Sequence, residues 1–250
     1  MAATKRKVLN VPTDLVYLDA PDLYESTGTV TKVTPNFEGG ITAVLDKTIF
    51  YPQGGGQPTD KGVISTESGE FQVSRVSFVD GDVLHNGRFS AGQISPGDVA
   101  RLTIDEELRK HHARLHTGGH LVMTAVDRLL GYPATKGYHF PDGPYVEFGG
   151  NIPAEKRDST VGEIQSLLDV LVAENSDVTW EFESVDALRA KDVHIPAEIP
   201  AGKPTRVVLT AGYYSPCGGT HVRRLGLLDG LKCRSVKVKS GKTRVSYSID

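Results

Sequence analysis

The sequence predicts an α+β protein made of a small N-terminal β-barrel or sandwich and a following domain of mixed helices and strands. Three observations support this class. Short alternating apolar stretches separated by Gly, Asn and Asp fill the first hundred residues. Apolar residues then recur at helical spacing over residues 105–131, and the chain ends in two alternating stretches around Ser240-Gly241. A length of 250 residues favours two domains, expected at 1–102 and 103–250.

The elements follow in order along the chain. Strands are predicted in "GTVTKVTP", "GITAVLDKTIFY", "GVISTE", "FQVSRVSFVDGDVLH" and the end of "AGQISPGDVARLTID". Acidic residues open the first helix, and Gly131 and Pro133 end it. A second helix follows Pro153, because proline suits a first helical turn. Next come a strand at 178–185, a short helix at 186–191, a strand at 205–214 and the terminal hairpin.

Composition excludes several classes of protein. The chain is 38% hydrophobic and 24% charged, which fits a globular protein. It has no run of eighteen apolar residues, so no membrane span is expected. The first twenty residues are not typical of a secretory signal, so we expect a frayed terminus and a cytoplasmic protein. Two cysteines argue against a disulfide framework, and a net charge of −3 argues against a globally basic, DNA-coating surface.

Charge is nevertheless unevenly distributed. Residues 223–244 carry eight Lys and Arg against one acid. Such a basic run has two interpretations: it binds nucleic-acid phosphates, or it is the solvated face of a hairpin.

Two pairs of potential metal ligands stand out. His116 and His120 lie four residues apart in the predicted helix, so both imidazoles share one face. Cys217 and His221 have the same spacing in "SPCGGTHVRR". Each pair alone has an ordinary interpretation, as surface or core histidines and as a turn with a reactive thiol. Together they form a Cys-His₃ set typical of zinc, so one Zn²⁺ per chain is predicted.

Glycines accompany these pairs. Gly118 and Gly119 lie inside the helix, where each costs about 0.5–1 kcal/mol relative to alanine. They indicate either close approach of a ligand or tight packing of the helix on a sheet. Gly54–Gly56, followed by Gln57, lack the Lys-Ser/Thr ending of a nucleotide P-loop. We expect that backbone to pass close to a strand or a ligand.

Taken together, "FYPQGGGQPTDKG", "HTGGH" and "CGGTH" resemble the motifs of the AlaX-type alanyl-tRNA editing proteins, relatives of the editing domain of alanyl-tRNA synthetase. The resemblance covers nearly the whole chain and is to the medium-length, free-standing form. It implies a two-layer α/β editing domain with an antiparallel sheet after the barrel. It also implies hydrolysis of mischarged tRNA(Ala), chiefly Ser-tRNA(Ala) and also Gly-tRNA(Ala), because a pocket for alanine excludes serine and glycine poorly.

The resemblance assigns roles to individual residues. The zinc ligands are His116, His120, Cys217 and His221. Gly54–Gly56 with Gln57 form the wall of the pocket, and Thr48 corresponds to a threonine that contacts the serine hydroxyl. Many members have Ala-Thr where this chain has Gly118-Gly119, which are further substrate-binding candidates. Arg223 and Arg224 begin the basic run and are expected to guide the tRNA end.

Two alternatives remain open. A zinc-stapled tRNA-binding module without catalysis would use the same four ligands to hold the sheet against the helix. Editing of another mischarged tRNA, such as a threonyl-type substrate, would use the same domain. The role of the metal is also open, because four protein ligands leave a tetrahedral ion no free position.

Overall fold

The computed structural model describes residues 12–36, 39–191 and 204–249. The first eleven residues, for which the sequence predicts a frayed terminus, lie outside these ranges. The contacts divide the described chain into two compact units. The first unit contains residues 12–17, 23–52 and 60–104, and the second contains 18–22, 53–59 and 105–249.

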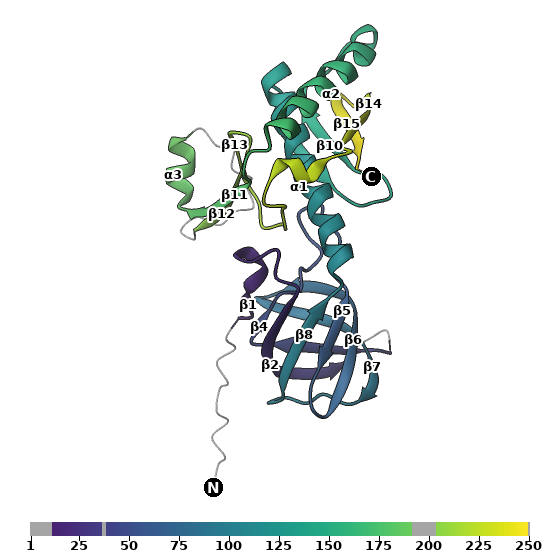
Figure 1. The fold of residues 1–250 in the computed structure, drawn as a ribbon, viewed down its shortest axis with the longest axis vertical. Coiled ribbons are helices and arrows are strands. Elements are labelled where there is room, and N and C mark those ends of the chain that lie inside the picture. Colours follow the sequence, from purple (N-terminus) through teal and green to yellow (C-terminus); the bar gives the residue numbers. More distant parts are fainter. Residues whose placement is uncertain (1–11, 37–38, 192–203, 250) are drawn as a thin grey trace. The chain divides into compact units, whose positions relative to one another are not determined.

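The first unit is a closed antiparallel barrel with the strand order β2-β3-β7-β6-β5-β8 (Figure 1). Alternate side chains point inward, and Ile64, Phe71 and Leu102 are fully buried in its core. Beside it, β1 (Asp14–Leu15) pairs in parallel with β4 (Lys47–Thr48). The barrel strands are β2 (Glu25–Pro35), β3 (Ile41–Leu45), β5 (Gly62–Ser65), β6 (Gly69–Val79), β7 (Asp82–Gly92) and β8 (Val99–Ile104). The structure confirms the predicted barrel.

Two stretches predicted as single strands are hairpins. The strand predicted from residue 71 is divided at Asp80-Gly81, where both residues have positive φ, 51° and 92°. The strand predicted at 205–214 turns in the same way at Ala211-Gly212, with φ of 49° and 83°. Two successive positive φ values match the twist of paired strands. Asp-Gly is a known sequence signal for such a turn. Ala-Gly is not, because alanine rarely adopts positive φ, so the turn at Ala211-Gly212 was not predicted.

The second unit contains two antiparallel sheets and two long helices (Figure 1). Its four-stranded sheet has the order β14-β15-β10-β9, and its three-stranded sheet has the order β11-β12-β13. The sequence analysis missed β9 and β10, which are short and mix apolar, charged and glycine residues. The strands are β9 (Ala134–Tyr138), β10 (Tyr145–Gly149), β11 (Thr179–Glu183), β12 (Thr205–Thr210), β13 (Tyr213–Pro216), β14 (Lys232–Lys239) and β15 (Lys242–Ser248).

Helix α1 (Glu106–Leu130) begins and ends as its sequence predicts. The side chain of Asp105 caps the first turn by accepting the N–H of Leu108 at 3.0 Å, and Gly131 ends the helix in a left-handed conformation. Helix α2 (Arg157–Glu174) follows the short 3₁₀ turn Ala154–Lys156.

Both helices pack on one face of the four-stranded sheet, so the unit has two layers. Leu121, Val122, Phe148 and Val245 meet in its core. The remaining helices are α3 (Val185–Ala190) and the 3₁₀ turns Val16–Leu18 and Leu225–Leu228. No helix in the described ranges is long and apolar enough to cross a membrane.

Candidate metal centre

The structure brings the two predicted ligand pairs together. One potential ligand atom each from His116, His120, Cys217 and His221 lies within 4.8 Å of all the others. Cys217 Sγ is 3.4 Å from Nε2 of both His116 and His221. Zinc–nitrogen and zinc–sulfur bond lengths give tetrahedral edges of about 3.5 Å, so this spacing suits a metal ion. The cluster can therefore hold a metal.

Gln57 determines which nitrogen of His116 faces the cluster. Its Oε1 lies 2.7 Å from His116 Nδ1 and accepts the backbone N–H of Thr220 at 3.0 Å. Its Nε2 donates to Thr220 Oγ1 at 2.8 Å. Since a backbone N–H can only donate, the oxygen of Gln57 must face both groups, and His116 Nδ1 must carry a proton. The lone pair of His116 Nε2 is then directed toward Cys217.

Thr117 does the same for His221. Its hydroxyl donates to the carbonyl oxygen of Ala113 at 2.8 Å and accepts the N–H of Val222 at 3.1 Å. Because this donation uses its one proton, the hydroxyl can only accept from His221 Nδ1, which is 3.1 Å away. His221 therefore also presents an unprotonated Nε2. Hydrogen bonds of this kind orient the histidines of metal centres.

The charge states of the cluster also fit a metal. Burial lowers the pKa of His116 and His221 well below the usual value, and that of His120 to about 4, so the imidazoles are neutral. Burial raises the pKa of the Cys217 thiol, although the N–H of Gly219 donates to its sulfur at 3.3 Å. His120 Nδ1 is buried without a hydrogen-bond partner among the described residues. A bound cation would stabilise the thiolate, and metal ligation satisfies a buried nitrogen.

Arg206 anchors the loop that carries Cys217 and His221. It donates from one terminal nitrogen to the carbonyl oxygens of Cys217 at 2.9 Å and Gly219 at 3.0 Å. A Cβ on Gly219 would lie 2.1 Å from Cε1 of His116, so the loop needs glycine there. The sequence analysis missed Arg206, whose only signal was a cation inside an apolar strand.

Known proteins match most of this chain. A model of the family described as tRNA synthetases class II (A) matches residues 19–108. The alanine–tRNA ligase of Methanothrix thermoacetophila is 32% identical over 216 residues, which are 85% of this chain and 23% of the ligase. The alanyl-tRNA editing protein AlaX-L of Pyrococcus horikoshii is 29% identical over 224 residues, which are 87% of this chain and 54% of that protein. Over most of its length this chain is therefore similar to an AlaX-type editing protein and to a region of alanine–tRNA ligases.

Coverage of these relatives is partial. The chain spans 23% of the ligase from Methanothrix thermoacetophila and 26% of the alanine–tRNA ligase of Pyrococcus abyssi, which is 29% identical. It spans about half of AlaX-L. The chain therefore corresponds to a part of these longer proteins.

The double glycine of α1 makes room for His139. A Cβ on Gly119 would lie 2.3 Å from Cε1 of His139, and one on Gly118 would lie 3.1 Å from Leu231 Cδ1. The His139 ring stacks on His116 with ring centroids 4.5 Å apart. Its Nδ1 donates to Tyr247 Oη at 2.6 Å, and that hydroxyl donates to the carbonyl oxygen of Leu115. Tight packing therefore accounts for Gly119; a role in substrate binding for either glycine stays a prediction.

Gly119→Ala is expected to destabilise the protein by about 1–3 kcal/mol, because His139 is held on several sides and cannot retreat from an added methyl group. Gly162→Ala, in the middle of α2, is the matched control. No atom lies within 4 Å of its added Cβ, so it should stabilise by about 0.5–1 kcal/mol. Urea unfolding measures both. A Gly119→Ala protein as stable as the control would contradict the packing role.

The glycine-rich segment lies in the second unit with the metal ligands, although the division expected at residue 102 placed it with the barrel. Gly55 and Gly56 have φ of 53° and 77°, and Gly54 and Gln57 exchange backbone hydrogen bonds across this turn. A Cβ on Gly56 would lie 2.4 Å from the carbonyl oxygen of Gly137. The turn therefore lets the segment pass close to β9 and presents Gln57 to His116.

Thr48 belongs to the barrel unit and is 1% exposed. His85 Nδ1 lies 3.1 Å from the carbonyl oxygen of Ala43, and burial lowers the pKa of His85 to about 4. The neutral ring therefore has its proton on Nδ1, and its Nε2 accepts the Thr48 hydroxyl at 2.9 Å. The same hydroxyl accepts the N–H of Phe50 at 3.1 Å. The structure thus assigns Thr48 a buried structural role; its contact with substrate stays a prediction.

Arg223 and Arg224 each have an acidic partner. Arg223 forms two hydrogen bonds with Asp22, at 2.6 and 3.1 Å, and lies over the Trp180 ring at 4.4 Å. Arg224 lies 3.2 Å from Asp177. These cations are balanced within the chain, and their role in substrate binding stays a prediction.

Proposed function

We propose that this chain is a zinc-dependent deacylase of mischarged tRNA(Ala), acting chiefly on Ser-tRNA(Ala) and also on Gly-tRNA(Ala). The observation that carries the proposal is the largely buried Cys-His₃ cluster, whose imidazoles are neutral and in which His116 and His221 already present an unprotonated Nε2. The relatives' names supply the substrate class, since they are alanine–tRNA ligases and an alanyl-tRNA editing protein.

The chain's residues have distinct tasks in this proposal. His116, His120, Cys217 and His221 would hold one Zn²⁺, which would supply Lewis-acid polarisation of the ester if it accepted a fifth ligand or exchanged one of the four. Gln57 and Thr117 keep the two Nε2 lone pairs directed into the cluster. Arg206 keeps the ligand loop in place, as do the buried hydrogen bonds that join Gln57 to Thr220. A site organised before the substrate arrives lowers the cost of orienting the ester.

A deacylation assay tests the proposal. Purified protein is incubated with tRNA(Ala) charged with Ser, Gly or Ala, and loss of the ester is followed over time. We expect the seryl ester to be lost fastest, the glycyl ester more slowly, and the alanyl ester at the rate seen in buffer. Binding of tRNA(Ala) without faster ester loss would instead identify a zinc-stapled binding module. If only a threonyl-type substrate were hydrolysed, the substrate would be that tRNA and not tRNA(Ala).

Replacing Thr48 by valine tests its proposed contact with the serine hydroxyl. We expect the seryl rate to fall more than the glycyl rate, because only serine offers a hydroxyl. We also expect the barrel to lose about 1–3 kcal/mol of stability, because Nε2 of buried His85 loses its donor. Both deacylation rates and thermal unfolding are measured. If the seryl and glycyl deacylation rates fell equally, Thr48 would not contact the serine hydroxyl and would only support His85.

A further inference from the structure

A ladder of stacked side chains runs across the four-stranded sheet of the second unit. The rings of Phe140 and Tyr138 stack with centroids 4.6 Å apart and planes 15° apart. Tyr138 stacks in turn on Tyr145, with centroids 5.3 Å apart and planes 19° apart. The guanidinium of Arg244 lies 3.8 Å from the centroid of the Tyr145 ring. We call these four residues the aromatic ladder.

The ladder lies on the face of the sheet opposite to the helices. Val146, Phe148 and Val245 point into the core beneath α1 and α2. Tyr145 and Arg244 alternate with these buried positions, so they point the other way. All four ladder residues are partly exposed. Tyr138 is the only group that stacks on Phe140 among the described residues, so Phe140 forms the free end of the ladder.

Positive charge predominates on the strands around the ladder, although Asp142 accepts the hydroxyl of Tyr138 at 3.0 Å. The four strands contain seven Lys and Arg and only one acid, Glu147, which pairs with Arg244 at 2.6 Å. Lys237 lies directly opposite Arg244, and Lys239 lies directly opposite Lys242. Like charges in directly opposed positions destabilise a hairpin. Glu147 offsets the first pair through Arg244, whereas an anionic ligand would offset the repulsion of the Lys239–Lys242 pair.

We propose that this face docks a single-stranded segment of the tRNA, with one base stacking on Phe140 and the phosphates contacting Lys237, Lys239 and Lys242. The proposal rests on the proposed function, which supplies the tRNA. Exposed aromatic rings on a four-stranded sheet, flanked by cations, are how several RNA-binding modules hold unpaired bases. Base stacking and arginine–ring contacts tolerate any base, so the surface would read the strand without sequence preference.

Nucleic acid fits this face better than other anionic partners. A membrane surface or an acidic peptide would explain the lysines but makes no use of a flat column of parallel rings. An unpaired base extends such a column and brings a phosphate within reach of the neighbouring cations. The structure therefore assigns separate tasks, stacking to Phe140 and charge neutralisation to the lysines.

The two tasks are separable by experiment. Labelled, uncharged tRNA(Ala) is titrated with protein at several salt concentrations, and fluorescence anisotropy gives Kd. Phe140→Leu should weaken binding about fivefold or more without changing its salt dependence, because stacking is lost and charge is kept. The double variant Lys239→Gln, Lys242→Gln should reduce the slope of log K against log salt by about 1.5, because two phosphate contacts are lost.

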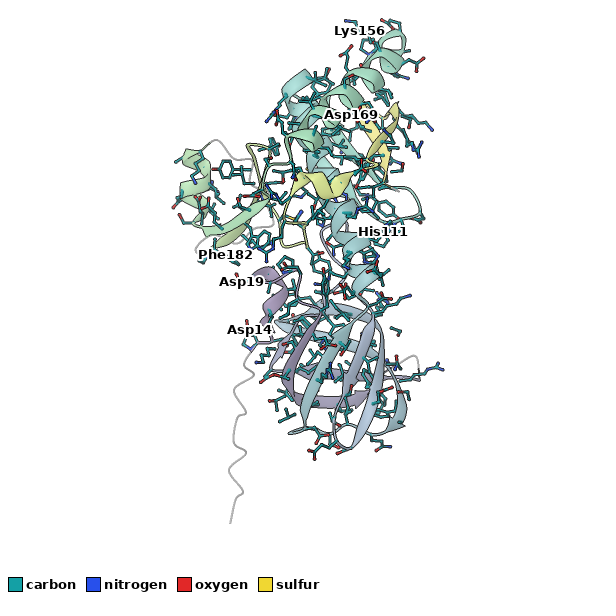
Figure 2. The ribbon with its side chains drawn as sticks, viewed as in Figure 1. Asp14, Asp19, His111, Lys156, Asp169 and Phe182 are labelled. Carbon is teal, nitrogen blue, oxygen red and sulfur yellow. The ribbon has the colours of Figure 1, made fainter. Side chains whose placement is uncertain are left out.

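Lys156→Gln is the matched control, because Lys156 is exposed at the start of α2, in the helical layer (Figure 2). It should bind like the unmodified protein. Wild-type Kd and salt slope in both the Phe140 variant and the double lysine variant would overturn the proposal. An equal slope change in the Lys156 control would also overturn the proposal. So would a double lysine variant that lost the binding of the unmodified protein to anionic lipid vesicles but kept its affinity for tRNA.

This assay needs no ester hydrolysis, so it is independent of the proposed reaction. If the variants bind as expected while mischarged tRNA is not hydrolysed, the docking surface stands and the deacylase proposal falls. If hydrolysis occurs and the variants bind like the unmodified protein, the deacylase stands and the docking surface falls.

Discussion

Replacing Cys217 by alanine is expected to remove the bound metal and lower deacylation of Ser-tRNA(Ala) by at least about 100-fold. The thiolate would be the only anionic ligand of the four, so three neutral imidazoles would hold the ion much more weakly. The chain should remain folded, because the hydrophobic cores of the barrel and of the second unit are built from other side chains. Metal content by atomic spectroscopy and the deacylation rate are measured together.

Cys233→Ala provides the matched control for this variant. Cys233 is the other free cysteine of the second unit; it is buried in the hydrophobic core and is absent from the ligand cluster. Its replacement should leave metal content unchanged and lower stability slightly. Full metal content in the Cys217→Ala protein would contradict the ligand assignment. Metal loss with unchanged deacylation would show that the ion has a structural role only.

Replacing Gln57 by leucine is expected to weaken metal binding about 10- to 100-fold, although Gln57 is not itself a predicted ligand. Leucine cannot accept the proton on His116 Nδ1, so nothing would hold the Nε2 lone pair toward Cys217. The N–H of Thr220 would also lose its acceptor in a fully buried site. Each unpaired buried group costs about 1–3 kcal/mol, so stability should fall as well. Competition with a chelator measures the metal affinity.

The Gln57→Glu variant tests whether Gln57→Leu acts through the orientation of the His116 ring or through other effects of the substitution. A carboxylate still accepts from His116 Nδ1 and from the N–H of Thr220, and the Thr220 hydroxyl can reverse its role and donate. Metal affinity in this variant should equal or exceed that of the unmodified protein. Equal weakening in the leucine and glutamate variants would show that Gln57 does not act through His116.

The sequence predicts the helices better than the sheets because helix signals are local. Asp105 and Gly131 mark the ends of α1, and each acts on backbone groups within a few residues. Strands depend on partners that are distant in sequence. The residues of β9 and β10 make a sheet only because β15, almost a hundred residues later, pairs with β10. The Ala211-Gly212 turn is equally hidden, since alanine rarely adopts positive φ.

The candidate ligand residues were accessible from the sequence, because four-residue spacing places two side chains on one face of a helix and the residue types are those that zinc prefers. Their organisation was not accessible. The proton on His116 Nδ1 follows from Gln57, which lies 59 residues away, and Gln57 is itself fixed by Thr220, 163 residues away. The need for glycine at position 119 likewise comes from His139, which follows β9.

By itself, then, the sequence determined the two long helices, most of the barrel strands and the Cys-His₃ set, which depend on local spacing and residue type. The tertiary structure decided the tautomers, the close packing at Gly119 and the aromatic ladder, because each of these requires contacts between segments that only folding brings together.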